Sequence, residues 1–146
     1  MRDLNRIFVL RLRAIAGIIT ACIIVSAHAA EFDGGGRIGD YLQLVAATEY
    51  TTRIEIAGVC ASACTIKLGA RHACVRADAR LLFHAARDAS GNVDKLGTLM
   101  MLHEYPPRIR AWAKRRGALD SQDFTAMTGA EAIALGVADC DASRPR

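Results

Sequence analysis

One serine of this chain lies where an apolar segment gives way to small residues. Residues 58–65 read GVCASACT, with Ser62 between two alanines. A hydroxyl at a strand-to-helix turn suits acyl transfer, because unpaired N–H groups at the start of a helix can stabilise an oxyanion. The flanking alanines also let a substrate approach closely. Ser62 is therefore a candidate nucleophile, and its alternative role is that of a helix cap, a position that serine favours.

A histidine that can act as a general base ends a second apolar segment. Residues 81–84 read LLFH, and α/β sheets commonly place functional groups beyond the carboxyl ends of their strands. A neutral imidazole at His84 can take the serine proton and later return it to the leaving group. The alternative is a structural, hydrogen-bonding histidine. His72 and His103 fall on a polar turn and on a helix, and we assign them no role.

The segments that must position these residues alternate between strand and helix patterns. Helices are expected at about 38–45, 62–69, 96–104, 107–116 and 128–136, and strands at 53–60, 73–75 and 79–83. The first helix follows the run Gly34 to Gly36, and the last begins with the capping-box pattern of residues 128–131, TGAE. Strands interleaved with helices predict an α/β fold.

Two helical segments carry residues that also suit binding. Five cations surround Trp112 in residues 108–116, a pattern that can bind nucleic acid. Ile109, Trp112 and Ala113 form an apolar stripe, however, so we expect them to be buried and the cations to be solvated. Residues 99–102 read LMML, which suits either a peptide-binding surface or core packing, and we favour the core.

The first 29 residues have the pattern of a secretory signal peptide. Four arginines within residues 1–13 precede twelve uncharged residues, 14–25, and an Ala-x-Ala cleavage pattern ends at Ala29. Twelve helical residues span about 18 Å, short of the roughly 30 Å of bilayer hydrocarbon. We therefore expect export of a domain that comprises residues 30–146. The alternatives are lipidation at Cys22 and an uncleaved signal that anchors the chain.

The charge of the chain belongs mostly to this leader. The sequence holds 19 Lys and Arg against 15 Asp and Glu, a net charge of +4, of which residues 1–29 contribute four arginines and one aspartate, or +3. The remaining domain carries +1. That balance gives no reason to expect a nucleic acid or an anionic membrane as the partner.

Four cysteines lie in the mature domain, and export would place them in an oxidising compartment. They are Cys60, Cys64, Cys74 and Cys140. An even number predicts two disulfides, but three pairings are open. Their spacings lack the Cys-x-x-Cys rhythm of structural zinc sites and of thioredoxin-like redox pairs, so we expect neither a metal nor a redox role.

Taken together, these segments resemble the Clp protease proteolytic subunit and its crotonase-like relatives. The matching stretches are residues 34–41 (GGGRIGDY), 58–65, 81–86 (LLFHAA), 128–132 (TGAEA) and 136–139 (GVAD). The chain resembles even more a set of small exported proteins described as Clp-protease-like. It lacks the strands and helix that precede the Gly-Gly turn in the full-size protease, so the resemblance implies a Clp-protease-like α/β fold that is truncated at its N-terminus.

The resemblance also implies a catalytic site. Ser62 would be the nucleophile and His84 the base, while the N–H groups of Ala63 and of Gly35 or Gly36 would form the oxyanion hole. The glycines suit that role independently, since a tight turn without a Cβ lets a peptide N–H approach the intermediate. The position of the family's aspartate holds Phe124, so the neighbouring Asp123 is the candidate that would orient His84.

The function that these observations favour is that of an exported, peptidase-like serine hydrolase, with a Ser-His dyad or a triad and no cofactor. Its expected substrate is a peptide or protein, and self-association is open. The alternative is a non-catalytic binding or structural domain of the same fold, with Ser62 as a helix cap. The acyl-CoA chemistry of crotonase relatives is disfavoured by export from the coenzyme A pool.

Overall fold

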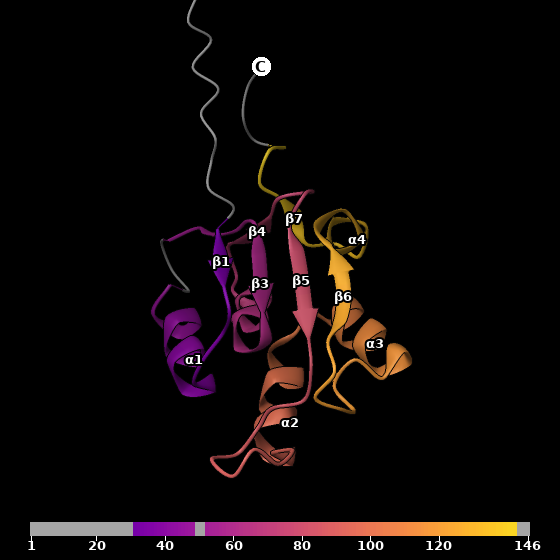
Figure 1. Ribbon diagram of the computed structural model, residues 1–146. Helices are drawn as coiled ribbons and strands as arrows, with labels where there is room; N and C mark the ends of the chain where they lie inside the picture. Colours follow the sequence, from indigo (N-terminus) through magenta and orange to yellow (C-terminus); the bar gives the residue numbers. More distant parts are fainter. Residues whose placement is uncertain (1–30, 49–51, 143–146) are drawn as a thin grey trace, which may run out of the picture.

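The computed structural model describes residues 31–48 and 52–142 of the chain, so the predicted signal peptide lies outside the described residues. The described part is a mixed α/β structure with two mainly parallel sheets (Figure 1). The α/β class predicted from the alternating segments is therefore confirmed.

The larger sheet has four strands in the order β1-β3-β5-β6. Its strands are β1 (Phe32–Asp33), β3 (Val59–Ala61), β5 (Arg80–Phe83) and β6 (Thr125–Thr128). The first three are parallel to one another, and β6 runs antiparallel to β5. The smaller, all-parallel sheet has the order β2-β4-β7, from β2 (Ile54–Ile56), β4 (Ala73–Val75) and β7 (Ala138–Asp139).

The single strand expected at 53–60 is wrong, because the chain passes from one sheet to the other at Gly58. This glycine has φ +58°, and a Cβ there would lie 2.0 Å from the Glu31 carbonyl oxygen. The same carbonyl accepts a hydrogen bond from the Val59 N–H at 2.7 Å. A left-handed glycine in close contact with Glu31, the residue before β1, therefore separates β2 from β3.

Five helical segments accompany the sheets, and none of those in the described residues is long and apolar enough to span a membrane. They are α1 (Ile38–Ala47), the 3-10 helix η1 (Ser62–Gly69), α2 (Lys95–Glu104), α3 (Pro107–Arg116) and α4 (Gly129–Ala134). The segment expected as a helix from Ser62 is thus a 3-10 helix. The capping box predicted at the start of α4 is present between Thr128 and Glu131.

Helix α3 has the predicted bounds and buries the predicted stripe of Ile109, Trp112 and Ala113. Most of its cations are exposed, which agrees with a solvated face, but Arg110 is half-buried and donates to the carbonyl groups of His103 and Tyr105. In the core, the Phe83 ring lies 5.4 Å from Tyr105 and 5.3 Å from Trp112, centroid to centroid. These aromatic contacts anchor the end of β5 against the helices.

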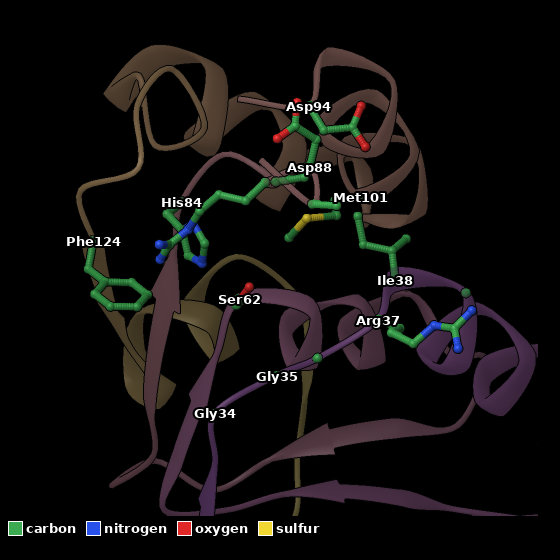
Figure 2. A pocket seen from close by; sticks show the side chains of 15 residues that line it. Gly34, Gly35, Arg37, Ile38, Ser62, His84, Asp88, Asp94, Met101 and Phe124 are labelled. Atoms are coloured by element: carbon green, nitrogen blue, oxygen red, sulfur yellow. The ribbon is translucent and has the colours of Figure 1, made fainter. Parts of the chain in front are cut away.

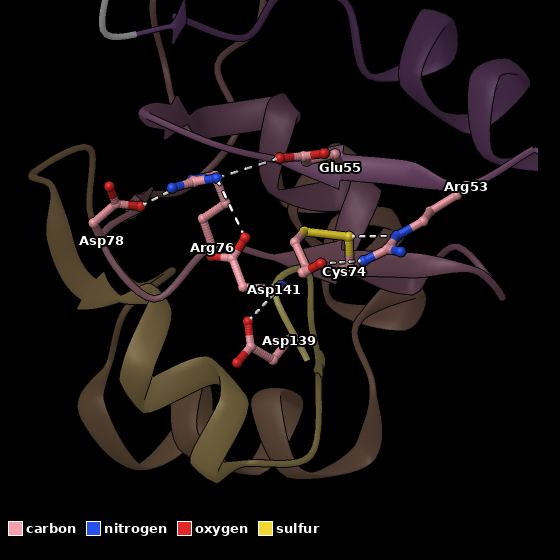
Figure 3. The surroundings of a disulfide bond; sticks show 8 residues. Arg53, Glu55, Cys74, Arg76, Asp78, Asp139 and Asp141 are labelled. Carbon is pink, nitrogen blue, oxygen red and sulfur yellow. Dashed lines mark hydrogen bonds and ion pairs between the residues drawn. A yellow bond between two sulfur atoms is a disulfide. The ribbon is translucent and has the colours of Figure 1, made fainter. Parts of the chain in front are cut away.

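Two disulfides are formed, as predicted, and the structure pairs Cys60 with Cys64 and Cys74 with Cys140. The first closes a short loop around Ser62. The second joins the C-terminal segment to β4, where Arg53 donates hydrogen bonds to the Cys74 sulfur and the Cys140 carbonyl (Figure 3). Two disulfides in so small a domain indicate an oxidising, extracytoplasmic environment.

Candidate active site

The larger sheet brings the predicted site residues to one edge. Strands β1, β3 and β5 are parallel neighbours, and the chain leaves their carboxyl ends through Gly35, Ser62 and His84 in turn. The register pairs Ala61 with Leu82, so Ser62 and His84 follow strands that end at nearly the same level. A parallel sheet therefore brings the glycine loop, the Ser62 turn and the His84 turn to one edge. Among the described residues, no hydrogen bond joins Ser62 to His84.

Ser62 occupies a backbone conformation that is rare for its residue type. Its φ of 57° makes it the one non-glycine residue with a positive φ within the described ranges. Ala61, rather than Ser62, is the N-cap of η1, and no side chain makes a capping hydrogen bond there. The geometry thus disfavours the helix-cap role and resembles the strained strand-to-helix turns that expose nucleophiles in hydrolases.

Covalent and hydrogen bonds hold the Ser62 turn in place. The Cys60–Cys64 disulfide brackets it, with both cysteines 1% exposed. The Thr65 hydroxyl donates to the Ser62 carbonyl at 2.6 Å and lies 2.7 Å from the Tyr105 hydroxyl. Because Thr65 has a single hydroxyl proton, Tyr105 must donate to it. The backbone of Ser62 is therefore tied through a buried relay to the residue that follows α2.

His84 is 5% exposed and lies beside an aromatic ring. The Phe124 ring packs edge-on against the imidazole, 4.9 Å between centroids at 88°. Burial lowers the pKa of His84 from its ordinary value near 6.5, a polar contact with the Ala85 backbone opposes this shift, and the nearby Arg87 guanidinium adds to it. Within the described part of the chain, the Nδ1 atom has no hydrogen-bond partner. The site thus favours the neutral imidazole that a general base requires.

Asp123 does not reach His84 in this structure. Its carboxylate accepts a hydrogen bond from the Ser121 hydroxyl at 3.3 Å on an exposed loop. The register of β5 with β6 pairs Phe83 with Thr125 and so sets Phe124, not Asp123, next to His84. Among the residues that the structure describes, no carboxylate bonds to the His84 imidazole at this sheet edge.

The glycine loop contacts the Ser62 turn directly. A Cβ at Gly35, where φ is +80°, would lie 2.6 Å from the Ala61 carbonyl oxygen and 2.8 Å from the Ser62 Cβ. The Gly35 N–H donates to the Asp33 carboxylate at 3.0 Å, so it is not available to an oxyanion. In contrast, the N–H groups of Gly36 and Ala63 make no hydrogen bond to any described residue.

Ser62 and His84 both face a pocket of about 700 Å³ (Figure 2). The glycine loop forms one wall, Phe124 stands beside His84, and Ile38 and Met101 add apolar surface. Arg37, Arg87, Asp88 and Asp94 also line the pocket. The wall therefore contains both charged and apolar side chains.

The apolar run at residues 99–102 is split between the core and the surface. Met101 is buried and lines the pocket, while Leu99 and Met100 are 61% and 40% exposed. The expectation that this run packs in the core is thus wrong for these two residues. An α-helix turns by about 100° per residue, so four consecutive apolar residues cannot all face one side.

Sequence reasoning missed several residues that shape this site. Asp33 and Thr65 hold the backbone of the glycine loop and of the Ser62 turn, and Phe124 covers His84. The bonds of Asp33 and Thr65 are local, but polar side chains two or three positions away are common and no pattern singles these out. The contact of Phe124 with His84 joins residues far apart in the chain, so no spacing pattern points to it. The described residues contain no cluster of three or more His, Cys, Asp or Glu side chains that could hold a metal.

The fold and the site define a disulfide-containing α/β domain with a serine and a histidine at the carboxyl edge of its larger sheet. Comparison of the chain with models of protein families, with curated proteins and with solved structures gives no match.

Proposed function

We propose that this protein is an exported serine hydrolase that acts on peptide bonds through Ser62 and His84. The observation that carries the proposal is the succession of glycine loop, strained serine and buried histidine along the carboxyl ends of β1, β3 and β5, all facing one pocket. The Clp-protease-like fold implied by the sequence motifs supports the same arrangement. The disulfides support export.

The proposed reaction proceeds through an acyl-enzyme. The Ser62 Oγ attacks the substrate carbonyl carbon while its proton passes to the neutral His84 imidazole. The carbonyl oxygen becomes an oxyanion, which the N–H groups of Gly36 and Ala63 stabilise. His84 then gives its proton to the leaving amine as the C–N bond breaks. Water then attacks the ester carbonyl while His84 takes its proton as the base. His84 returns that proton to the Ser62 Oγ as the acid product leaves.

No carboxylate bonds to His84 within the described residues, and this lowers the expected rate of hydrolysis. In Ser-His-Asp triads, the aspartate orients the imidazole and stabilises the imidazolium. Here, the edge-on Phe124 ring is the group that packs against the imidazole. We therefore propose a Ser-His dyad, whose turnover should be slower than that of a full triad.

Hydrolysis of a p-nitrophenyl ester and of a fluorescent casein by the oxidised protein, residues 30–146, tests the proposal. We expect turnover by the wild type and a loss of at least about 10³-fold in Ser62→Ala and His84→Ala. His103→Ala is a matched control, because His103 is exposed and lies outside the pocket. Equal rates in wild type and Ser62→Ala would contradict a hydrolase and favour a binding domain.

A further inference from the structure

One carboxylate joins the glycine loop to two helices next to the Ser62 turn. Asp33 is the last residue of β1, and its Oδ1 accepts hydrogen bonds from the Gly35 N–H and the Tyr41 hydroxyl. Its Oδ2 accepts from the Lys67 Nζ at 2.7 Å. Tyr41 lies on α1 and Lys67 on η1. Asp33 therefore binds the loop, α1 and the helix that begins with Ser62 at a single point.

This contact point lies on the segments that would form the oxyanion site. Gly35 packs against the Ala61 carbonyl and the Ser62 Cβ without room for a side chain. The Asp33–Gly35 hydrogen bond fixes the direction of the Gly35 N–H, and hence the turn that leads into Gly36. The bond to Lys67 fixes the loop relative to η1, whose first turn carries the Ala63 N–H.

The three donors keep Asp33 ionised. Partial burial raises the pKa of Asp33, but the hydrogen bonds from Lys67, Tyr41 and Gly35, with the Lys67 charge, outweigh that effect and lower it. Burial, together with the neighbouring Asp33 carboxylate, raises the pKa of Tyr41 to about 12. The tyrosine is therefore protonated at neutral pH and continues to donate. The Lys67 ammonium also lies 5.8 Å from the centroid of the Tyr41 ring.

We propose that Asp33 is a positioning residue of the hydrolase. It takes the Gly35 N–H for itself, holds the loop against the Ser62 turn, and leaves the Gly36 N–H as the loop's oxyanion donor beside that of Ala63. This inference rests on the proposed function, because an oxyanion site has a purpose only if Ser62 is acylated. Asp33 acts through the loop and touches neither the substrate nor the reacting atoms.

The test compares the second-order rate constants with which a fluorophosphonate labels Ser62 in oxidised wild type and variants. A phosphonylated serine is a tetrahedral adduct, so its formation depends on the oxyanion donors. Asp33→Ala should lower the constant about 10²-fold, since a misplacement near 1 Å has that effect. Asp33→Asn should lower it less, because the remaining Oδ1 can still accept from Gly35. The matched control is Asp40→Ala, which removes an exposed carboxylate from α1.

A second measurement does not depend on catalysis. The amide of Gly35 is protected from hydrogen exchange by its bond to Asp33, so its exchange should accelerate at least tenfold in Asp33→Ala and stay unchanged in Asp40→Ala. Exchange of the β3 amides reports whether the fold is intact. If Asp33→Ala does not fold, Asp33→Asn and Lys67→Met take its place in both measurements, with smaller expected changes.

The outcomes separate the two proposals. Wild-type labelling above the Ser62→Ala background, combined with slower labelling and faster Gly35 exchange in the Asp33 variants, supports the positioning role. Wild-type labelling constants in folded Asp33 variants, or an unchanged Gly35 exchange rate, overturn it while the hydrolase stands. Labelling of the wild type no higher than that of Ser62→Ala overturns the hydrolase itself, and the oxyanion role of Asp33 with it.

Discussion

At the scale of single residues, the most unusual property of Ser62 is its backbone conformation, with a φ of 57°. A non-glycine residue in the left-handed region costs of order 1–2 kcal/mol, and the surrounding structure must impose that conformation. Here, the Cys60–Cys64 disulfide, the Thr65 hydroxyl and the tight contact with Gly35 impose it. Sites that hold such strain are commonly functional.

This strain predicts an unusual stability effect. Ser62→Gly should have a larger free energy of unfolding than Ser62→Ala, by about 1 kcal/mol, because glycine adopts a positive φ without a steric penalty. Urea denaturation of the two oxidised variants at pH 7 measures the difference. A Ser62→Ala protein that is as stable as Ser62→Gly would show that φ at this position is negative in solution.

The buried imidazole predicts two effects of pH. The pKa of His84 is lowered below its ordinary value near 6.5, so the hydrolysis rate should rise with pH with a midpoint below 6.5. Between the folded and unfolded pKa values, the unfolded chain binds more protons than the native one. The free energy of unfolding should therefore decrease as the pH falls below about 6.5.

Denaturant titrations at pH 5 and pH 7 check the stability effect, with His84→Gln as the control that lacks the titrating group. The decrease between these pH values should be smaller in His84→Gln than in the wild type. A decrease of the same size in both proteins would contradict the attribution to His84, as would a hydrolysis midpoint above 6.5.

Residue types and spacing placed Ser62 and His84 directly after apolar segments, and the structure shows strands in both segments. Residue types and spacing did not identify the side chains that pack or bond next to these two residues. The residue that packs beside His84 is Phe124, one position after the predicted Asp123. The antiparallel register of β5 and β6 determines this placement. The hydrogen bonds of Asp33 link residues up to 34 apart, and no local pattern encodes them.

At the scale of the elements, the site depends on how η1 is attached to the residue after α2. The relay from Tyr105 through Thr65 to the Ser62 carbonyl is buried, since Tyr105 is 1% and Thr65 0% exposed. Burial also raises the pKa of Tyr105. A buried hydroxyl without a partner is costly, so the two side chains should be coupled in stability.

The coupling gives a double-mutant prediction. Thr65→Val should cost about 1–3 kcal/mol, because it leaves the Tyr105 hydroxyl without an acceptor. Tyr105→Phe added to Thr65→Val should recover part of that loss. Urea denaturation of the four proteins in the cycle measures the interaction free energy. Additive effects of the two substitutions would contradict the relay.

Periodicity predicted the helices and strands with strong internal patterns. It failed for segments whose bounds depend on contacts with other parts of the chain. Helix α3 matches its predicted bounds, because its proline start and apolar stripe are local properties. The segment 53–60 splits into two strands because Gly58 adopts a left-handed conformation against Glu31, which adjacent residues do not reveal. Strand β6 was not predicted, since Met127 is the one fully buried residue of its four.

At the scale of the whole molecule, we expect the two disulfides to contribute differently to stability and to the geometry of the site. Cys74 and Cys140 are separated by 66 positions and join β4 to the C-terminal segment, whereas Cys60 and Cys64 are separated by 4 and enclose the Ser62 turn. The entropy of closing a loop in the unfolded chain grows with loop length. The long-range bond should therefore dominate stability, and the short one should dominate the geometry of the site.

Paired substitutions test this division. Cys74→Ala/Cys140→Ala should cost about 4 kcal/mol of unfolding free energy and Cys60→Ala/Cys64→Ala about 2 kcal/mol, from the loop-length dependence. Hydrolysis should show the opposite order, with the larger loss in the Cys60/Cys64 pair, measured at a temperature where both variants are folded. A Cys60/Cys64 variant with wild-type hydrolysis would show that the turn holds Ser62 without its disulfide.

The nucleophilic role of Ser62 is tested by locating a covalent adduct on the protein. Oxidised protein is treated with a fluorophosphonate, digested, and its peptides are analysed by mass spectrometry. We expect a phosphonyl group on the peptide that contains Ser62, and we expect no such group in Ser62→Ala or in protein denatured before treatment. An unmodified Ser62 peptide in the folded wild type, or labelling that persists in Ser62→Ala, would contradict it.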